Sequence, residues 1–295
     1  MSLIINHNMM AMNATRNLSN SYKALSNSVA RLSSGLRINS AADDAAGLAI
    51  RELMRADIAA LNQGVRNAND AISMIQTADG ALGVIDEKLI RMKELAEQAA
   101  TGTYNSDQRL MIESEYQAMA SEITRIANAT DFNGVHLLNG NLSGEHDGEP
   151  LTPTGSMKIH FGPANDSAED YYYIDMGNAT ASALGVGNSA VPDKAAYTVS
   201  TQAAAQRALD GITEAINSKD KIRANLGAMQ NRLENTISNL QIQAENLQAA
   251  ESRISDVDVA SEMTEFVRNQ VLTQAAVAML SQANSLPQMA LRLMG

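Results

Sequence analysis

The best candidates for metal chemistry lie in one short loop, His146-Asp147-Gly148-Glu149, where an imidazole and two carboxylates are close in sequence. Metal ligands must converge on one ion, and this spacing fits no established ligand motif, so a solvated acidic loop is the better interpretation. Asp43 and Asp44 are paired carboxylates, but carboxylates at the start of a helix stabilise the positive end of its dipole without any catalytic role. We therefore predict no enzyme activity, no cofactor and no metal site.

The composition excludes several classes of partner. The chain of 295 residues has 22 Lys plus Arg against 33 Asp plus Glu, a formal net charge of −11. A phosphate backbone repels such a surface, so we predict no nucleic-acid partner. Cysteine is absent, which rules out disulfides and thiolate metal sites. No stretch is apolar enough for a signal peptide or a membrane span, so we predict no membrane partner.

The elements that position the side chains are helices. Near the N-terminus, apolar residues recur in alternating steps of four and three, which places one stripe on a helix face. Gly35 suits the left-handed position after a helix end. Asn39 and Ser40 are predicted to cap the next helix, with Asp43 and Asp44 in its first turn. The apolar stripe consists of Leu18, Tyr22, Leu25, Val29 and Leu32.

A much longer helix is predicted from Ala41 to about Ala100, where the same alternation continues almost unbroken. Asp79 interrupts the stripe, and Gly80 and Gly83 would permit a bend. Sixty helical residues span roughly 90 Å. A helix of this length cannot bury its stripe against itself, so it needs partner helices of similar length.

The middle of the chain contains the only strand candidates. A third helix is predicted to end near Asn128, followed by a turn from Asp131 to Gly134. Farther on, 157–161 and 171–176 combine apolar and aromatic residues in short runs typical of strands. They would form a loose hairpin, which is marginal alone and is therefore expected to lie on the helices.

Helix returns near Thr201 with a stripe that runs from Leu209 to Leu247. One extra step of four resembles a stutter, which locally unwinds a coiled coil. The pattern resets around 252–258, and a last helix follows, which we expect to end before Pro287.

The two ends of the chain mirror each other, since each has a terminal helix, an irregular joint and a long helix. The predicted fold is mainly α, a long antiparallel coiled-coil helix bundle with a small β-hairpin region. The stripes of 1–34 and 259–295 could pair within one chain, but two short stripes with polar backs bury little surface alone. We favour packing between copies, with terminal helices that order on assembly. The predicted assembly residues are Leu18, Tyr22, Leu25, Val29, Leu32, Met263, Val267, Val271, Ala275 and Met279.

Several short runs of sequence are far more specific than the helical pattern. Together they resemble bacterial flagellins, the subunits of the flagellar filament, over about 3–138 and from about 204 to the C-terminus. The runs are Leu32 to Gly47, Arg66 to Asp70, Phe132-Asn133-Gly134, Glu251 to Asp258, Arg268 to Leu272 and Ala278 to Asn284.

The resemblance implies a structural role in swimming motility. Flagellins are exported unfolded through the flagellar type III apparatus with an export chaperone on the C-terminal region, and they assemble under a filament cap into an extracellular homopolymer that also meets hook-associated proteins. The implied divisions are 1–40 and 255–295 for the filament core, 41–138 and 201–254 for an inner helical shell, and 139–200 for a short variable segment.

A host receptor is a further partner that the resemblance implies. Many flagellins are bound by a Toll-like receptor through the long helix and the helix after it, and the matching positions are Arg91, Leu95 and Glu115. Arg91 and Leu95 are four apart and share a helix face. Because Leu89 and Met92 belong to the buried stripe, Arg91 and Leu95 are expected to turn partly outward. An ordinary solvated face, with Glu94 and Glu115 balancing Arg91, is the alternative.

Two other functions remain possible at this point. A hook–filament junction protein shares the terminal pattern, although the run from Leu32 to Gly47 fits the filament subunit better. A helical signalling rod would show near-perfect heptads and usually a membrane span, whereas this chain has a strand-bearing middle.

Overall fold

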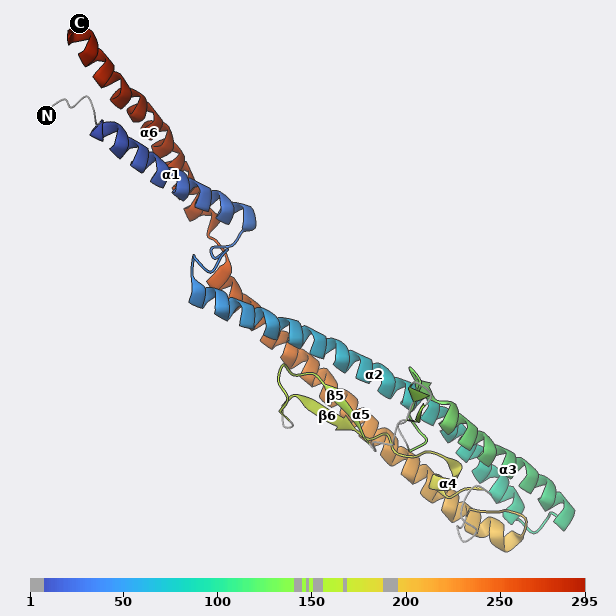
Figure 1. Ribbon diagram of the computed structural model, residues 1–295. Helices are drawn as coiled ribbons and strands as arrows, with labels where there is room; N and C mark the ends of the chain where they lie inside the picture. Colours follow the sequence, from blue (N-terminus) through green and yellow to red (C-terminus); the bar gives the residue numbers. More distant parts are fainter. Residues whose placement is uncertain are drawn as a thin grey trace. The chain divides into compact units, whose positions relative to one another are not determined.

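The computed structural model describes residues 8–140, 145–146, 149–150, 156–166, 169–187 and 196–294. The chain divides into two compact units, and the division falls inside both long helices. Unit 1 comprises Met1–Ile58 and Glu245–Gly295, and unit 2 comprises Ala59–Ala244. The helices are α1 (Met9–Ser34), α2 (Ala45–Ala100), α3 (Ser106–Ala129), α4 (Ala181–Leu184), α5 (Gln202–Ser255) and α6 (Val259–Met294) (Figure 1).

Helix α1 ends as the sequence predicts, but α2 begins differently. Gly35 follows α1 with φ 72°, the left-handed conformation that glycine adopts without steric cost. The prediction that Asn39 and Ser40 cap α2 is wrong. A turn intervenes, α2 starts at Ala45, and the Asp44 carboxylate accepts a hydrogen bond from the Gly47 N–H at 2.9 Å. Asp44 therefore satisfies a free N–H of the first helical turn.

In unit 2, α2 and α5 run antiparallel and are joined by two ion pairs. Arg223 Nε lies 2.7 Å from Asp79 Oδ1, and Lys219 Nζ lies 2.6 Å from Asp86 Oδ1. From Asp79 to Asp86 the residue number rises along α2, while the number of the partner on α5 falls from Arg223 to Lys219. The two helices are therefore antiparallel. The Lys219 side chain is only 2% exposed and also contacts Asp220 at 2.7 Å. Asp79, which interrupts the apolar stripe in the sequence, is thus a cross-helix ion-pair partner.

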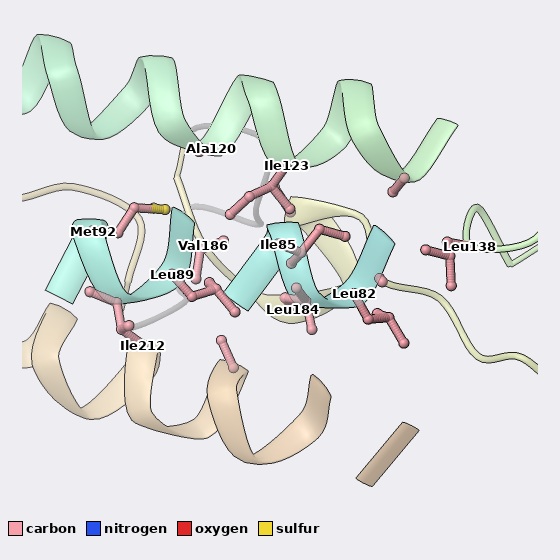
Figure 2. Packing of buried hydrophobic residues seen from close by; sticks show 14 of the residues in the cluster. Leu82, Ile85, Leu89, Met92, Ala120, Ile123, Leu138, Leu184, Val186 and Ile212 are labelled. Carbon is pink, nitrogen blue, oxygen red and sulfur yellow. The ribbon is translucent and has the colours of Figure 1, made fainter. Parts of the chain in front are cut away.

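The core of unit 2 lies where α2 is covered on more than one side. Figure 2 shows Leu82, Ile85 and Leu89 of α2 between Ile123 of α3 and Ile212 of α5. Asn105 starts α3 with a capping box, in which its side chain accepts from Gln108 N and the Gln108 side chain accepts from Asn105 N. The predicted stripes of all three helices therefore meet in one apolar cluster.

The described strands form three small antiparallel sheets. They are β1 (Asp131–Phe132) with β2 (Val135–His136), β3 (Glu145–His146) with β4 (Glu149–Pro150), and β5 (Met157–His160) with β6 (Tyr171–Ile174). The predicted main hairpin is therefore present, with strands one or two residues shorter than expected. It lies on the helices, since the Asn67 side chain of α2 donates to the His160 carbonyl at 2.8 Å and Arg232 of α5 stacks on Tyr172.

A glycine permits this close approach of the hairpin to α2. A Cβ atom at Gly64 would lie 1.9 Å from the Phe161 carbonyl oxygen, a distance that no side chain could tolerate. The mainly-α architecture with antiparallel long helices and a small hairpin is confirmed. The expectation that the last helix ends before Pro287 is wrong, because α6 continues to Met294. A proline removes one helical hydrogen bond, and a helix can resume beyond that local loss.

Candidate functional site

The terminal helices α1 and α6 form the part of unit 1 that could act as a binding surface. They lie side by side and antiparallel (Figure 1). At one end, the Asn8 side chain donates to the Ala283 carbonyl at 2.8 Å. At the other end, Arg31 lies 3.6 Å from Glu262. Polar contacts thus fix the register of the pair at both of its ends.

The contact face of this pair is thin. Ser28 and Ala283 are buried, whereas Leu18, Leu25 and Leu32 are only half-buried. Small and polar side chains allow the two helices to approach but remove little apolar surface from water. The pair therefore gains much less hydrophobic stabilisation than the core of unit 2.

An apolar ridge remains exposed along α6. Side chains at every fourth position from Val259 to Met279 point to solvent, with the large ones 43–62% exposed. Leu272 and Val277 are exposed beside the ridge, and Tyr22 and Val29 are exposed on α1. A monomeric protein rarely leaves a continuous apolar strip of this kind uncovered. The ridge residues are Val259, Met263, Val267, Val271, Ala275 and Met279.

Apolar side chains are in fact distributed around the whole of α6. A step of four residues advances about 40° around a helix, so a ridge with that spacing winds around the axis. Phe266 and Leu280 are meanwhile half-buried, and α6 has almost no amphipathic polarity. Because these apolar side chains do not all lie on the face that α1 contacts, the described structure leaves part of the apolar surface of α6 uncovered.

The predicted assembly residues consequently separate into two groups. Leu18, Leu25 and Leu32 are half-buried within the unit, while Tyr22, Val29 and the five predicted positions of α6 are exposed. Val259, Leu272 and Val277 are exposed on the same helix, although none of them was among the predicted residues. The signal for Val259 was available, because it lies four residues before Met263 and extends the same ridge.

The joint between the terminal and long helices is held by backbone hydrogen bonds. The Arg37 N–H donates to the Ser255 carbonyl at 2.6 Å, and the Val257 N–H donates to the Gly35 carbonyl at 3.0 Å. The Arg37 guanidinium also donates to the Ile254 carbonyl at 2.6 Å. The two joints of the chain, which the sequence predicts as separate irregular segments, therefore form one small paired structure.

Side chains of the Leu32-to-Gly47 run and of α2 also stabilise this joint through burial and hydrogen bonds. Ile38 is buried, and the buried Arg51 donates to the Ile38 carbonyl at 2.9 Å. The Asp43 carboxylate accepts from the N–H groups of Ser40 and Asn39 at 3.0 and 3.2 Å, and these bonds hold its pKa below the ordinary value, with a smaller contribution from Arg31. The most specific run of the sequence thus folds into a hydrogen-bonded turn, in which the Asp43 carboxylate caps backbone N–H groups.

The three residues matched to a receptor contact lie in unit 2. Arg91 donates to Glu115 at 2.8 and 3.0 Å and to Glu94 at 2.9 Å, and these bonds, Glu115 first, raise the arginine pKa. Leu95 is only 1% exposed, so the expectation that it turns outward is wrong. Leu95 belongs instead to the apolar cluster of unit 2, where α2 is covered on more than one side.

The candidates for metal chemistry gain no support. Among the described residues, no group of three or more His, Asp or Glu side chains is arranged to hold a metal ion. Asp147 and Gly148 of the His146–Glu149 loop lie outside the described residues. Within the described part of the chain, no helix combines the length and the apolar character needed to cross a membrane.

These features define a class of protein, a helical structural subunit with an uncovered apolar terminal pair. Comparison with known families identifies which one. Residues 5–143 match the family described as bacterial flagellin N-terminal helical region, and residues 209–294 match the bacterial flagellin C-terminal helical region. The chain belongs to the bacterial flagellin family. It is a structural subunit of the flagellar filament, the surface structure of bacterial motility.

Individual relatives agree over nearly the whole length. The chain is 44% identical to the flagellar filament 33 kDa core protein of Treponema phagedenis, over 99% of this chain and 100% of that protein. It is 43% identical to a flagellin of Bacillus subtilis, over 98% and 99% of the two chains. A solved structure of a proposed flagellar hook-associated protein from Vibrio parahaemolyticus aligns with TM-score 0.56 at 14% identity, over 72% of this chain and 100% of that one, and shows the fold alone. The alternatives of a junction protein or a signalling rod are not favoured.

Proposed function

We propose that copies of this chain polymerise through α1 and α6, with 1–40 and 255–295 as the filament core, 41–138 and 201–254 as an inner helical shell, and 139–200 as a short variable segment. The observation that carries the proposal is α6, whose apolar side chains spread around the helix, while α1 is the helix that covers it in the described part of the chain. Neighbouring copies would cover the ridge from Val259 to Met279. Removing that surface from water supplies the driving force for association.

The geometry of such contacts favours an open fibre. The exposed ridge of α6 and the exposed residues of α1, Tyr22 and Val29, are different surfaces of one chain. When one surface binds a different surface of the next copy and the rotation does not close, the product is a helical filament.

Purified protein tests this proposal directly. We expect sedimentation to separate a polymer above a critical concentration, and electron microscopy to show filaments in that fraction. A chain that stays monomeric at high concentration and in the presence of filament seeds would contradict the proposal.

We further propose that the terminal helices become ordered only on assembly. The thin contact between α1 and α6 provides little stabilisation to offset the conformational entropy of ordering both helices. Limited proteolysis should trim both ends of the monomer and leave them intact in the filament. Equal resistance in the two states would refute this.

Export partners follow from the same surface. We propose that the chain leaves the cell unfolded through the flagellar type III apparatus, that an export chaperone covers the α6 segment beforehand, and that filament cap and hook-associated proteins meet it outside. An uncovered apolar segment needs such a cover to stay soluble. Amide exchange with the chaperone present should protect residues 259–285. Protection confined to unit 2 would contradict the proposal.

A host Toll-like receptor is the last proposed partner, with Arg91 and Glu115 as contacts. Both are exposed on neighbouring helices and paired with each other. Leu95→Ala is unsuitable as a test, because it would create a core cavity. Receptor signalling by depolymerised wild type should fall for Arg91→Ala and for Glu115→Gln, while Arg125→Ala, an exposed arginine also on a salt bridge to glutamate, serves as the matched control. Unchanged signalling in both variants would remove the site.

A further inference from the structure

Methionine is the side chain most open to oxidation in this protein. The sequence has 16 methionines and neither cysteine nor tryptophan. Among amino-acid side chains, sulfur groups react most readily with peroxides, and with no thiol present the thioethers have no competitor. Solvent exposure then decides which methionines an oxidant reaches first.

Exposed methionines are concentrated in the terminal helices. Six side chains on α1 and α6 are 43–62% exposed, whereas Met74, Met92 and Met176 of unit 2 are buried. Met111 on α3, at 73%, is the exposed methionine of unit 2 among the described residues. The six are Met9, Met10, Met12, Met263, Met279 and Met289.

Two of these methionines belong to the ridge itself. Met263 and Met279 lie at its regular four-residue spacing. Met12, on α1, lines a groove of about 600 Å³ between the terminal helices together with Leu280 and Asn284 of α6. These side chains are therefore part of the surface that association would bury.

We propose that the six terminal-helix methionines form an oxidation-sensitive switch that controls polymerisation, with hydrogen peroxide or a related peroxide as the oxidant. The proposal rests on the assembly role of α1 and α6 given above. The thioether sulfur attacks one peroxide oxygen, and an S–O bond forms as the O–O bond breaks. The proton of the attacked oxygen passes to the other oxygen, which leaves as water from hydrogen peroxide or as an alcohol from an organic peroxide. Sulfur loses two electrons and the peroxide gains them. The product is methionine sulfoxide, which a methionine sulfoxide reductase returns to the thioether.

The sulfoxide acts by making an apolar contact polar. Its oxygen is a hydrogen-bond acceptor, and burying an acceptor without a donor is unfavourable. Because every copy carries the modification, every contact of the polymer would be weakened. Unit 2 would stay folded, since its own methionines in the core are shielded. The switch therefore stops assembly without denaturing the subunit.

Peptide mapping by mass spectrometry tests the accessibility part. Monomer and filament are treated with hydrogen peroxide in parallel, and oxidation of each methionine is followed over time. The six exposed methionines should oxidise quickly in the monomer, and their oxidation rates in the filament should be lower by about tenfold or more. Met74, Met92 and Met176 should react slowly in both states. Equal rates for the six sites and the buried three would overturn the proposal.

Sedimentation tests the assembly part. Oxidised monomer should show a critical concentration about tenfold or more above that of untreated protein, and treatment with methionine sulfoxide reductase should restore it. A variant with all six residues changed to leucine should assemble normally after oxidation, because leucine replaces methionine with little change in volume. Met111→Leu is the matched control and should keep the wild-type sensitivity.

A second variant makes the test independent of the leucine protein. Met263→Gln with Met279→Gln introduces polar side chains that peroxide does not oxidise, so its critical concentration should be raised before any treatment. Three results would each overturn the switch. They are normal assembly of this glutamine variant, normal assembly of oxidised wild type, and an assembly defect of the six-leucine variant after oxidation. Failure of untreated wild type to assemble would instead overturn the proposed polymerisation, so the two failures are distinguishable.

Discussion

The two units of this protein use helical apolar stripes in opposite ways. In unit 2, α2 buries Leu82, Ile85 and Leu89 against α3, α5 and the segment that contains α4. In unit 1, α6 exposes its ridge from Val259 to Met279 and, among the described residues, packs against α1. Similar sequence periodicity thus produces a closed core in one unit and an open surface in the other, and the number of covering elements makes the difference.

Among the changes that separate the roles of the two units, deletion of residues 259–295 should have the largest effect. The change removes α6 and should abolish polymerisation, while unit 2 keeps its own stripes and its apolar cluster. Circular dichroism should show a cooperative thermal transition for unit 2, and sedimentation should show only monomer. Normal filaments from the truncated chain would refute the assignment of the core.

Charges on the exposed ridge should act nearly as strongly without removing any element. Val267→Asp with Val271→Asp should raise the critical concentration at least about a hundredfold, because assembly would bury carboxylates without partners. The stability of the monomer should barely change, since both positions already face solvent. Met111→Asp is the control, because it places a negative charge on an exposed apolar site of unit 2. A comparable assembly defect in this variant would contradict a specific role of the ridge in assembly.

Truncation of one apolar side chain in each unit should sharpen the comparison at the level of folding. Leu89→Ala should lower the free energy of unfolding by about 2–5 kcal/mol, because it leaves a cavity in a fully buried cluster. Val271→Ala should change it by less than about 0.5 kcal/mol in the monomer. Chemical denaturation measures both. A large cost at Val271 would mean that the monomer already buries the ridge.

The smallest effect concerns the joint and its pH dependence. The pKa of Asp43 is lowered in the folded chain, so its contribution is present above its ordinary value of about 3.8 and is lost as pH falls through the lower folded pKa. The protection of the Ser40 and Asn39 amides, that is, their exchange rate relative to the intrinsic rate at each pH, should therefore fall in acid in the wild type. Asp43→Asn should show lower protection at neutral pH and should lack that acid-dependent loss. Identical profiles would exclude a structural role for the carboxylate.

Helix positions were predictable because apolar periodicity is a local property of the sequence. What the sequence could not supply was the identity of partners. Asp79 interrupts an apolar stripe in the sequence, yet only the fold shows that Asp79 pairs with Arg223 and that Lys219 pairs with Asp86. Leu95 was misplaced for the same reason, since one stripe predicts one buried face and α2 is covered on more than one side.

The assembly surface shows the same limit. Its residues could be named from periodicity, because the terminal stripes stand apart from the long helices. The division into half-buried Leu18 and Leu25 and exposed Tyr22 and Val29 required the actual packing angle of α1 on α6. The cap at Asp44 was missed because a turn separates Ser40 from the helix, and side-chain types alone did not reveal it.

The ion pairs between α2 and α5 also constrain when the fold can form. Their partners are 144 and 133 residues apart in sequence, so closing the core requires two distant stretches of chain to meet, with the entropy loss of a long loop. Contacts of such high sequence separation make folding slow relative to local helix formation. A chain that enters a new compartment one end first would therefore lack the core of unit 2 until the residues of both α2 and α5 have entered. The timing of folding is thus set by topology, so that under the proposed export route the core of unit 2 would form only after both long helices have left the export apparatus.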